Sequence, residues 1–252
     1  MFMNTDSSDL TLMQLSDSFF PSGLYTMSNG LETIFDEKRA TSQNDIFDFL
    51  QITLEQQLGP ADSVALSNAY DCATNNDLLG IMECDDILHS MKLIQESRAA
   101  SCRSGSQMMK CISAISPHNL LEQFSEKIAK NESPGMHPVV IGVCSFVMGV
   151  KKEQAKQMMM YGFCVSVTGA ALRLGIIDHI QSQKILHEIK PKIQQILEKF
   201  SDTKINDCWQ FSPKYDLFQM THENKFSKMS VSYTHLRAHE TRGNLVCRLL
   251  LE

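Results

Sequence analysis

The stretch HPVVIGVCSFVMGV, residues 137–150, is apolar around almost its whole circumference when it is wound as a helix. A helix without a polar face is buried, because no side of it favours contact with water. Residues 152–174 form a second helix of nearly the same character, in which the small residues Gly162, Gly169 and Ala170 let neighbouring helices approach closely. These two segments predict the centre of an all-α fold.

Helical spacing of apolar residues continues outward from these segments in both directions. No run of alternating apolar and polar residues bounded by turn residues interrupts it, so the sequence predicts no strand. The further helices are expected at residues 9–19, 31–37, 45–58, 61–74, 77–115, 118–130 and 177–200. Together they predict a single-domain, all-α bundle of about eight to ten helices, with helices of ordinary length.

Glycine and proline give the expected boundaries. Gly59-Pro60 is expected to end one helix, and Gly80 is a candidate break in the long segment after it. The segment NESPGMHP, residues 131–138, predicts a loop. Pro191 is expected to kink or split the last helix.

Composition excludes several classes of protein. The 252 residues are 43% hydrophobic and 21% charged, with a formal net charge of −6, which is typical of a soluble globular protein and not of a nucleic-acid binder. No apolar run approaches the roughly 18 residues that span a bilayer. The first residues lack the basic and apolar regions of a secretory signal. We therefore expect a cytoplasmic protein without nucleic-acid or membrane partners.

The eight cysteines are scattered singly, with no CxxC pair. In a chain without a signal peptide, this pattern predicts reduced and mostly buried thiols. Met158, Met159 and Met160 belong to an unusually large set of 15 methionines, which favours a methionine-rich core over an adaptable contact surface.

Motifs for common enzyme mechanisms are missing from the sequence. It has no GxxxxGK[ST] phosphate loop, no GxSxG nucleophile motif, no HExxH zinc motif and no set of kinase motifs. The sequence therefore predicts a protein that is not an enzyme.

Three residues are candidate metal ligands: His137, His222 and Cys208. A mixed histidine and cysteine set suits a borderline metal such as nickel or zinc. For each residue taken alone, a surface or core role without metal is the favoured interpretation. His179 and His187 lie two helical turns apart, about 12 Å, and cannot share one ion without a third element.

Arg98, Arg103 and Arg173 lie among small or apolar residues on predicted helices. Arginine in such a setting can reach a carboxylate with two parallel hydrogen bonds, within one chain or between chains. One interpretation is a buried ion pair that holds helices together, with Glu32 as a candidate partner. The other is a contact at a partner interface, and the sequence leaves both open.

Residues 231–252 do not look native. Residues 231–241 and 245–252 back-translate to two constant parts of an adapter used for transposase-based sequencing libraries, in frame, in order and separated by the length of a barcode. We therefore divide the chain into an all-helical domain at residues 1–229 and an adapter-derived tail at residues 230–252 that replaces the true C-terminal residues.

Five segments in order resemble the urease accessory proteins of the F type. The first is LMQLSDSFFPSGLYTMSNGLE at 12–32, a Pro-x-Gly turn followed by Ser-x-Gly-Leu-Glu. The others are SRAASCRSGSQMM at 97–109, HPVVIGVCSFVMGV at 137–150, VSVTGAALRLGIIDHIQSQKIL at 165–186 and FSPKYDLFQMTHENKFSKM at 211–229. The resemblance spans nearly all of residues 10–229.

This resemblance implies an all-α urease maturation chaperone without catalysis of its own. Such a protein assembles with the D/H-type accessory protein and the G-type GTPase, delivers nickel to apo-urease, modulates the GTPase cycle and forms homodimers. It holds no tight cofactor, and nickel would pass only transiently. The residues that match the family's motifs, and that the resemblance assigns to partner binding, are Glu32, Arg98, Arg103, Gln107, Arg173, Gln183 and Glu223.

The alternative from another class is a helical small-ligand-binding protein or enzyme. Its ligand would occupy an apolar pocket between residues 139–150 and 152–174, lined by Met148, Met159 and Phe163. A closed cavity at these side chains would favour this alternative. Filled space there, with an exposed apolar patch elsewhere, would favour the scaffold.

Overall fold

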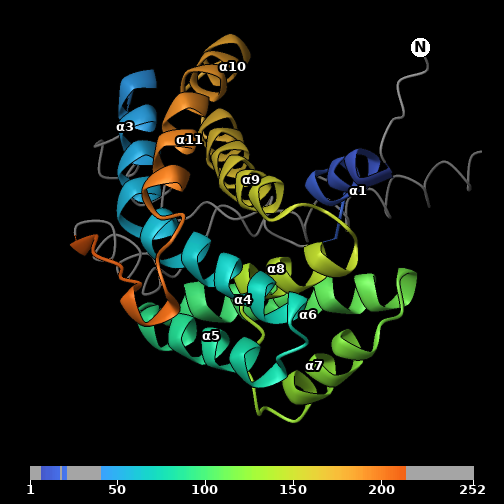
Figure 1. The fold of residues 1–252 in the computed structure, drawn as a ribbon. Coiled ribbons are helices and arrows are strands. Elements are labelled where there is room, and N and C mark those ends of the chain that lie inside the picture. Colours follow the sequence, from blue (N-terminus) through green and yellow to red (C-terminus); the bar gives the residue numbers. More distant parts are fainter. Residues whose placement is uncertain (1–6, 18, 22–40, 214–252) are drawn as a thin grey trace, which may run out of the picture.

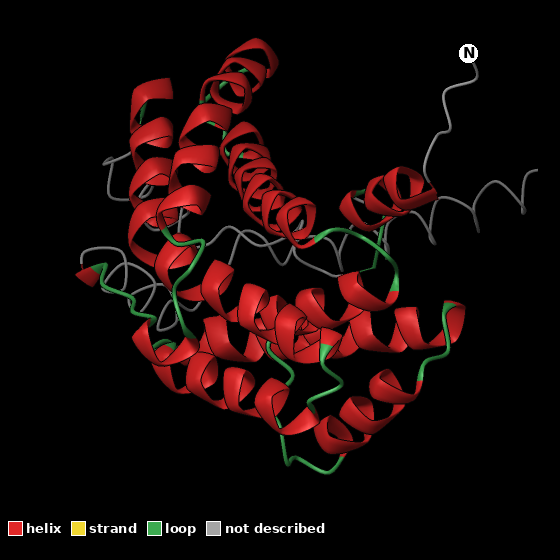
Figure 2. Ribbon diagram, viewed as in Figure 1, coloured by secondary structure: helices red, strands yellow, loops and turns green. Residues whose placement is uncertain are grey.

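The computed structural model describes residues 7–17, 19–21 and 41–213. These residues fold entirely into helices and connecting loops, and none of them forms a strand (Figure 2). The all-α expectation is confirmed. No helix in these ranges has both the length and the hydropathy to cross a membrane.

The helices run in two groups that meet at the middle of the molecule (Figure 1). In chain order they are α1 (Ser7–Ser16), α3 (Gln43–Thr53), the π-helix η2 (Leu54–Ser63), α4 (Val64–Thr74), α5 (Leu78–Met91), α6 (Gln95–Ile115), α7 (Asn119–Ala129), α8 (His137–Val147), α9 (Lys152–Arg173), α10 (His179–Glu188), α11 (Lys190–Lys199) and the short 3₁₀-helix η3 (Ile205–Asp207). One hydrophobic cluster joins α4, α5, α6, α7 and α8, and a second joins α3, η2, α9, α10 and α11.

The α8 helix lies at the centre of the first cluster, as its apolar sequence predicts. Residues 137–145 are all buried. Gly142 faces α4, where a Cβ atom would lie 2.5 Å from the Leu66 carbonyl oxygen, so only glycine permits this approach of two backbones. The loop expected at residues 131–138 ends earlier than predicted, because α8 begins at His137. Pro138 fits in the first turn of α8, since the N–H groups of a first turn have no partner within the helix and proline lacks this group.

The predicted stop at Gly59-Pro60 is wrong. The chain continues without interruption from α3 through η2 into α4, and Pro60 lies inside the π-helix. The wider π-helical turn accommodates the proline ring, which would clash with the preceding turn of an α-helix. Gly59 is needed for packing here, since a Cβ atom would lie 2.5 Å from Ile196 Cγ2 of α11.

The long segment 77–115 is broken, but not at Gly80. Asp77 caps α5 by accepting a hydrogen bond from the Gly80 N–H at 2.9 Å, so Gly80 lies inside the first turn. The break falls at residues 92–94, which are extended between α5 and α6, with Ile94 buried.

Other expected boundaries agree more closely. The segments 118–130 and 152–174 correspond to α7 and α9, and Pro191 splits the last helix into α10 and α11. Close packing at Gly162 was expected and is wrong for the described residues, because none of their atoms would lie within 4 Å of a Cβ there. The predicted helix at 31–37 and the proposed tail at 230–252 lie outside the described residues.

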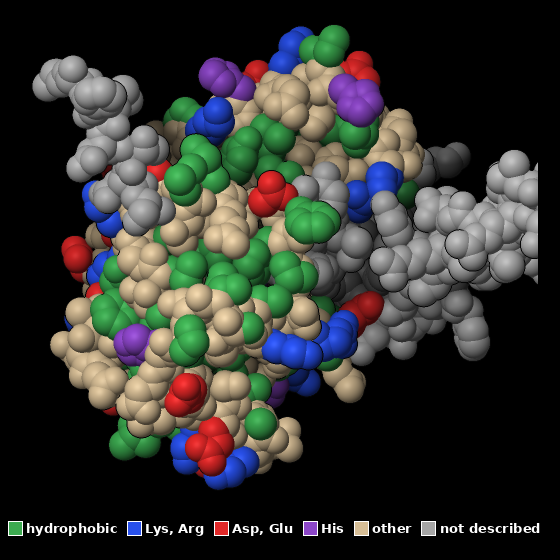
Figure 3. All heavy atoms as spheres, turned by 90° about the vertical axis from the view of Figure 1, so that its right-hand side faces the viewer, with side chains coloured by type: hydrophobic (Ala, Val, Ile, Leu, Met, Phe, Trp, Pro, Cys, Tyr) green, Lys and Arg blue, Asp and Glu red, His purple; other side chains and the backbone are tan. Residues whose placement is uncertain are grey.

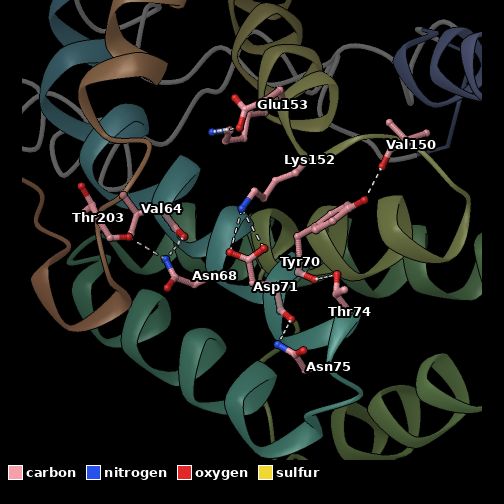
Figure 4. A network of polar contacts seen from close by, with 11 residues as sticks. Val64, Asn68, Tyr70, Asp71, Thr74, Asn75, Val150, Lys152, Glu153 and Thr203 are labelled. Carbon is pink, nitrogen blue, oxygen red and sulfur yellow. Dashed lines mark hydrogen bonds and ion pairs between the residues drawn. The ribbon is translucent and has the colours of Figure 1, made fainter.

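Polar side chains of α4 hold the start of α9 and the chain after α11 (Figure 4). The Tyr70 hydroxyl donates to the Val150 carbonyl at 3.1 Å, and Lys152 Nζ lies 2.9 Å from the Asp71 carboxylate. Asn68 donates to the Thr203 carbonyl at 3.0 Å. The bonds of Asp71 and Asn68 join α4 to α9 and to the chain after α11, which belong to the second group of helices.

Candidate functional site

A groove with a volume of about 510 Å³ opens between α1, α6, α8, α9 and the extended residues 92–94. One part of its wall is apolar and includes Met108, Ile141, Met159 and Phe163. On the face of the molecule that α1, α6 and α7 border, hydrophobic side chains gather over the middle (Figure 3). An open groove with an apolar wall is suited to contact with a ligand or with another protein.

The other part of the groove wall is polar and is centred on an ion pair. Lys92 Nζ lies 2.5 Å from Asp62 Oδ2, and the two side chains are only 14% and 11% exposed. Arg98 on α6 donates from Nη1 to the Lys92 carbonyl oxygen at 3.0 Å. Arg98 therefore fixes the backbone that carries Lys92, and Lys92 in turn ties the extended residues to the π-helix.

The π-helix also binds the last described segment of the chain. The Trp209 N–H donates to the Pro60 carbonyl at 3.2 Å, and the Phe211 N–H donates to the Gln56 carbonyl at 3.0 Å. Gln57 donates a further hydrogen bond to the Ser212 hydroxyl. Since Gln210 lines the groove, these bonds place the end of the described chain at the groove margin.

His137 is the first residue of α8 and lines the groove, although its side chain is almost fully buried. Burial lowers its pKa to about 4, so the imidazole is neutral at neutral pH. The backbone N–H of His137 donates to the Ser101 hydroxyl of α6 at 3.1 Å. A neutral imidazole is the form that binds a metal ion.

A buried carboxylate positions the loop before His137. Asp85 on α5 has no exposed surface and accepts hydrogen bonds from the Ser133 hydroxyl at 2.5 Å and from the N–H groups of Gly135 and Met136 at 2.6 and 2.7 Å. Burial raises the pKa of Asp85, and the three hydrogen bonds oppose this rise. The carboxylate thereby fixes the entry into α8.

The loop also packs closely against α6. A Cβ atom at Gly105 would overlap the Gly135 carbonyl oxygen, so a side chain at Gly105 would push the loop away. Gly135 itself has a φ of +73°, a conformation that favours glycine. These two glycines let the loop lie flat on α6 and reach Asp85.

The predicted partner-binding residues differ in how far their side chains are exposed. Arg98 is half-buried and holds the Lys92 carbonyl, whereas Arg103, Gln107, Arg173 and Gln183 are exposed. Within the described ranges, no ion pair joins any of the three arginines to a carboxylate. Glu32 and Glu223 lie outside the described residues.

The candidate metal ligands are not brought together in the described part of the chain. His137 lies at the groove, while Cys208 follows η3, is half-buried and packs against both hydrophobic clusters. No group of three His, Cys, Asp or Glu side chains in the described ranges has the arrangement of a metal site. His222 lies outside these ranges.

The apolar pocket of the alternative interpretation is only partly present. Met159 and Phe163 line the groove, but Met148 packs against the first hydrophobic cluster. The groove is partly open to solvent and also involves α1 and residues 92–94. It therefore differs from the closed cavity between two helices that this alternative requires.

Several residues of the groove region were missed by sequence reasoning. Asp62, Lys92 and Asp85 are charged residues in ordinary helical patterns, and their partners lie far away in sequence. The signal that could have found Asp85 is the helical phase of α5, which places it on the same buried face as Ile81 and Leu88.

The described residues define an all-α protein with an open, partly apolar groove. A model of the UreF family matches residues 40–190. The urease accessory protein UreF of Trichodesmium erythraeum is 33% identical over 228 residues, which cover 90% of this chain and 98% of that protein. UreF 2 of Brucella suis is 29% identical over 84% of this chain and 87% of its own length, and UreF of Bacillus sp. TB-90 is 28% identical over 85% and 94%.

The chain belongs to the UreF family of urease accessory proteins. Members of this family are chaperones and not enzymes, so the chain has a role in urease maturation and no catalytic site is assigned to it. The predicted resemblance to this family is thereby confirmed.

Proposed function

We propose that this chain is a scaffold that assembles with the D/H-type accessory protein and the G-type GTPase, delivers nickel to apo-urease and modulates the GTPase cycle. It would act in the cytoplasm and as a homodimer. The observation that carries the proposal is the similarity to a urease accessory protein over 90% of this chain and 98% of the relative.

The exposed residues on α6 and α9 support a docking role. Arg103 and Gln107 lie one turn apart on α6, so their side chains share one face. Arg173 lies in the last turn of α9. These side chains are exposed and can bind a partner without any change to the core.

Nickel would pass through this protein only transiently. His137 presents a neutral imidazole at the groove, and the described residues supply no second and third ligand beside it. A single imidazole binds a metal weakly compared with a tetrahedral set. His222 and Cys208 remain proposed ligands together with His137.

Co-purification with the two partner classes tests the proposal. Arg103→Glu and Arg173→Glu are expected to lower the yield of the complex with the D/H-type protein or the G-type GTPase at least several-fold, with unchanged circular dichroism. Lys190→Glu, an exposed charge reversal on α11, is the matched control and should bind as the unmodified chain does. Normal yields for both arginine variants would remove these residues from the interface.

A second measurement tests the function itself. Nickel-dependent activation of apo-urease by the mixed accessory proteins should require this chain, and the GTP hydrolysis rate of the G-type protein should change when the chain is added. Full activation without it would refute the proposed role. The assays should include a chain without residues 231–252, so that an effect of the proposed tail is recognised.

A further inference from the structure

Two cysteines meet where α4 and α5 form a helical hairpin. Cys72 lies in the last turn of α4, Cys84 lies in the second turn of α5, and residues 75–77 connect the helices. The Cys72 sulfur lies against the face of α5 that carries Cys84. Both belong to the same hydrophobic cluster, Cys84 as a buried member and Cys72 at its edge.

The backbone of α5 makes room for the Cys72 thiol. Gly80 precedes Cys84 by one helical turn and therefore lies on the same face of α5. A Cβ atom at Gly80 would lie 2.7 Å from Cys72 Sγ. The absence of a side chain at Gly80 thus lets the thiol of α4 settle over the first turn of α5, directly before Cys84.

The two thiols differ in exposure. Cys72 is half-buried and can be reached from solvent, whereas Cys84 is 1% exposed. In a reactive pair, the reachable sulfur meets the oxidant and the buried sulfur resolves the product.

The electrostatic surroundings support the same division. The hydrogen bond from Cys84 lowers the pKa of Cys72, while burial and the carboxylates of Asp77, Asp71 and Glu83 oppose this change. The pKa of Cys84 is raised by its hydrogen bond to Cys72 and by burial. Cys72 is therefore the better thiolate, and Cys84 keeps its proton.

We propose that Cys72 and Cys84 form a peroxide-sensitive dithiol that closes to a disulfide between α4 and α5. The Cys72 thiolate attacks one oxygen of hydrogen peroxide, the O–O bond breaks, and a sulfenic acid and hydroxide result. The Cys84 thiol then attacks the sulfenic sulfur, the S–O bond breaks, and water leaves with the proton of Cys84. In total, two thiols and one peroxide give one disulfide and two waters, and a dithiol reductant reverses the change.

The other described cysteines do not have this arrangement. The Cys102 thiol contacts the Met136 sulfur at 3.6 Å, and Cys111 accepts a hydrogen bond from Gln107. Cys144 and Cys164 are buried. Cys111 is half-buried like Cys72 and is therefore a matched control for simple exposure.

Peptide mapping of the full chain after treatment with hydrogen peroxide tests the proposal. Free thiols are alkylated, and the chain is then cut with a protease that cleaves before aspartate, because Asp77 lies between the two cysteines. The expected result is a cross-linked pair of peptides, residues 71–76 with 77–84, that separates on reduction. The denatured chain should run at the position of a single chain on a non-reducing SDS gel. The proposal is overturned if Cys72 is found as sulfinic or sulfonic acid, or joined to any other cysteine.

Three variants make the result specific. Cys111→Ser should form the cross-link as the unmodified chain does. Cys84→Ser should lose the cross-link and accumulate sulfenic acid at Cys72. Gly80→Ala should reduce the cross-link yield, since the added Cβ displaces the Cys72 sulfur. If Cys84→Ser does not fold, the peptide map of the unmodified chain alone decides the question.

Discussion

The Ser133 hydroxyl donates a hydrogen bond to the Asp85 carboxylate at 2.5 Å, across 48 positions in the sequence. With the N–H groups of Gly135 and Met136, it surrounds a carboxylate that no solvent reaches. Asp85→Ala should lower the free energy of unfolding by about 3 kcal/mol, because it leaves buried donors without an acceptor. Urea denaturation measures this, with exposed Asp86→Ala as the neighbouring control. Equal stability of the two variants would contradict the role of Asp85.

A change of pH should act through His137. The pKa of His137 is lowered to about 4 in the folded chain, below its ordinary value of 6.5. As the pH falls from 6.5 to 4, the unfolded chain therefore binds a proton that the folded chain does not, and folding loses about 3 kcal/mol of stability. Below pH 4 this contribution no longer changes.

The free energy of unfolding, measured by denaturation between pH 6.5 and 4 in the presence of a metal chelator, tests the prediction. His137→Gln should show a shallower loss of stability between pH 6.5 and 4 than the unmodified chain. His179→Gln, at an exposed position on α10, should keep the full slope. The same slope in all three proteins would mean that His137 remains accessible to protons.

Two glycines in helices should respond in opposite directions to alanine. Gly142→Ala should destabilise the fold by about 2 kcal/mol, because the new Cβ meets the Leu66 carbonyl oxygen of α4 at 2.5 Å. Gly162→Ala meets nothing within 4 Å and should stabilise α9 by up to about 1 kcal/mol. Thermal unfolding of the two variants gives the comparison. A lower melting temperature for both variants would show that α9 is closely packed at Gly162.

The ion pair between Asp62 and Lys92 should stabilise the packing of residues 92–94 against the π-helix. A double-mutant cycle with alanine at both positions should give a coupling energy of about 1–2 kcal/mol, because the two groups are largely shielded from water. The same cycle for the more exposed pair Glu126 and Lys130, with side chains 64% and 57% exposed, should give almost no coupling energy. Coupling of equal size in both cycles would place Asp62 and Lys92 in open solvent.

Much of the fold could be predicted because the spacing of apolar residues along a helix indicates which of its faces is buried. The sequence of α8 has no polar face, and α9 follows the expected limits almost to the residue. The errors concern local signals that tertiary packing overrides. Pro60 is tolerated inside a π-helix, and the break at residues 92–94 contains neither glycine nor proline but buries Ile94.

The groove could be predicted only in part. The alternative interpretation places Met159 and Phe163 at a pocket because they belong to an apolar helix, and both line the groove. Asp62, Lys92 and Asp85 could not be placed, since the pairing of a buried charge depends on which distant segments meet. The spacing of Cys72, Gly80 and Cys84 likewise acquires meaning only when α4 and α5 are seen to face each other.

The amides of Trp209 and Phe211, bonded to the Pro60 and Gln56 carbonyls, also bear on how this molecule can be engineered. They fix residues 209–211 against the π-helix, at the end of the described part of the chain. A fluorophore or affinity handle installed directly after Pro213 would begin its path beside Gln210 and report on occupancy there. A handle at Ser7, at the beginning of α1, would begin on a different helix and give an independent reference signal.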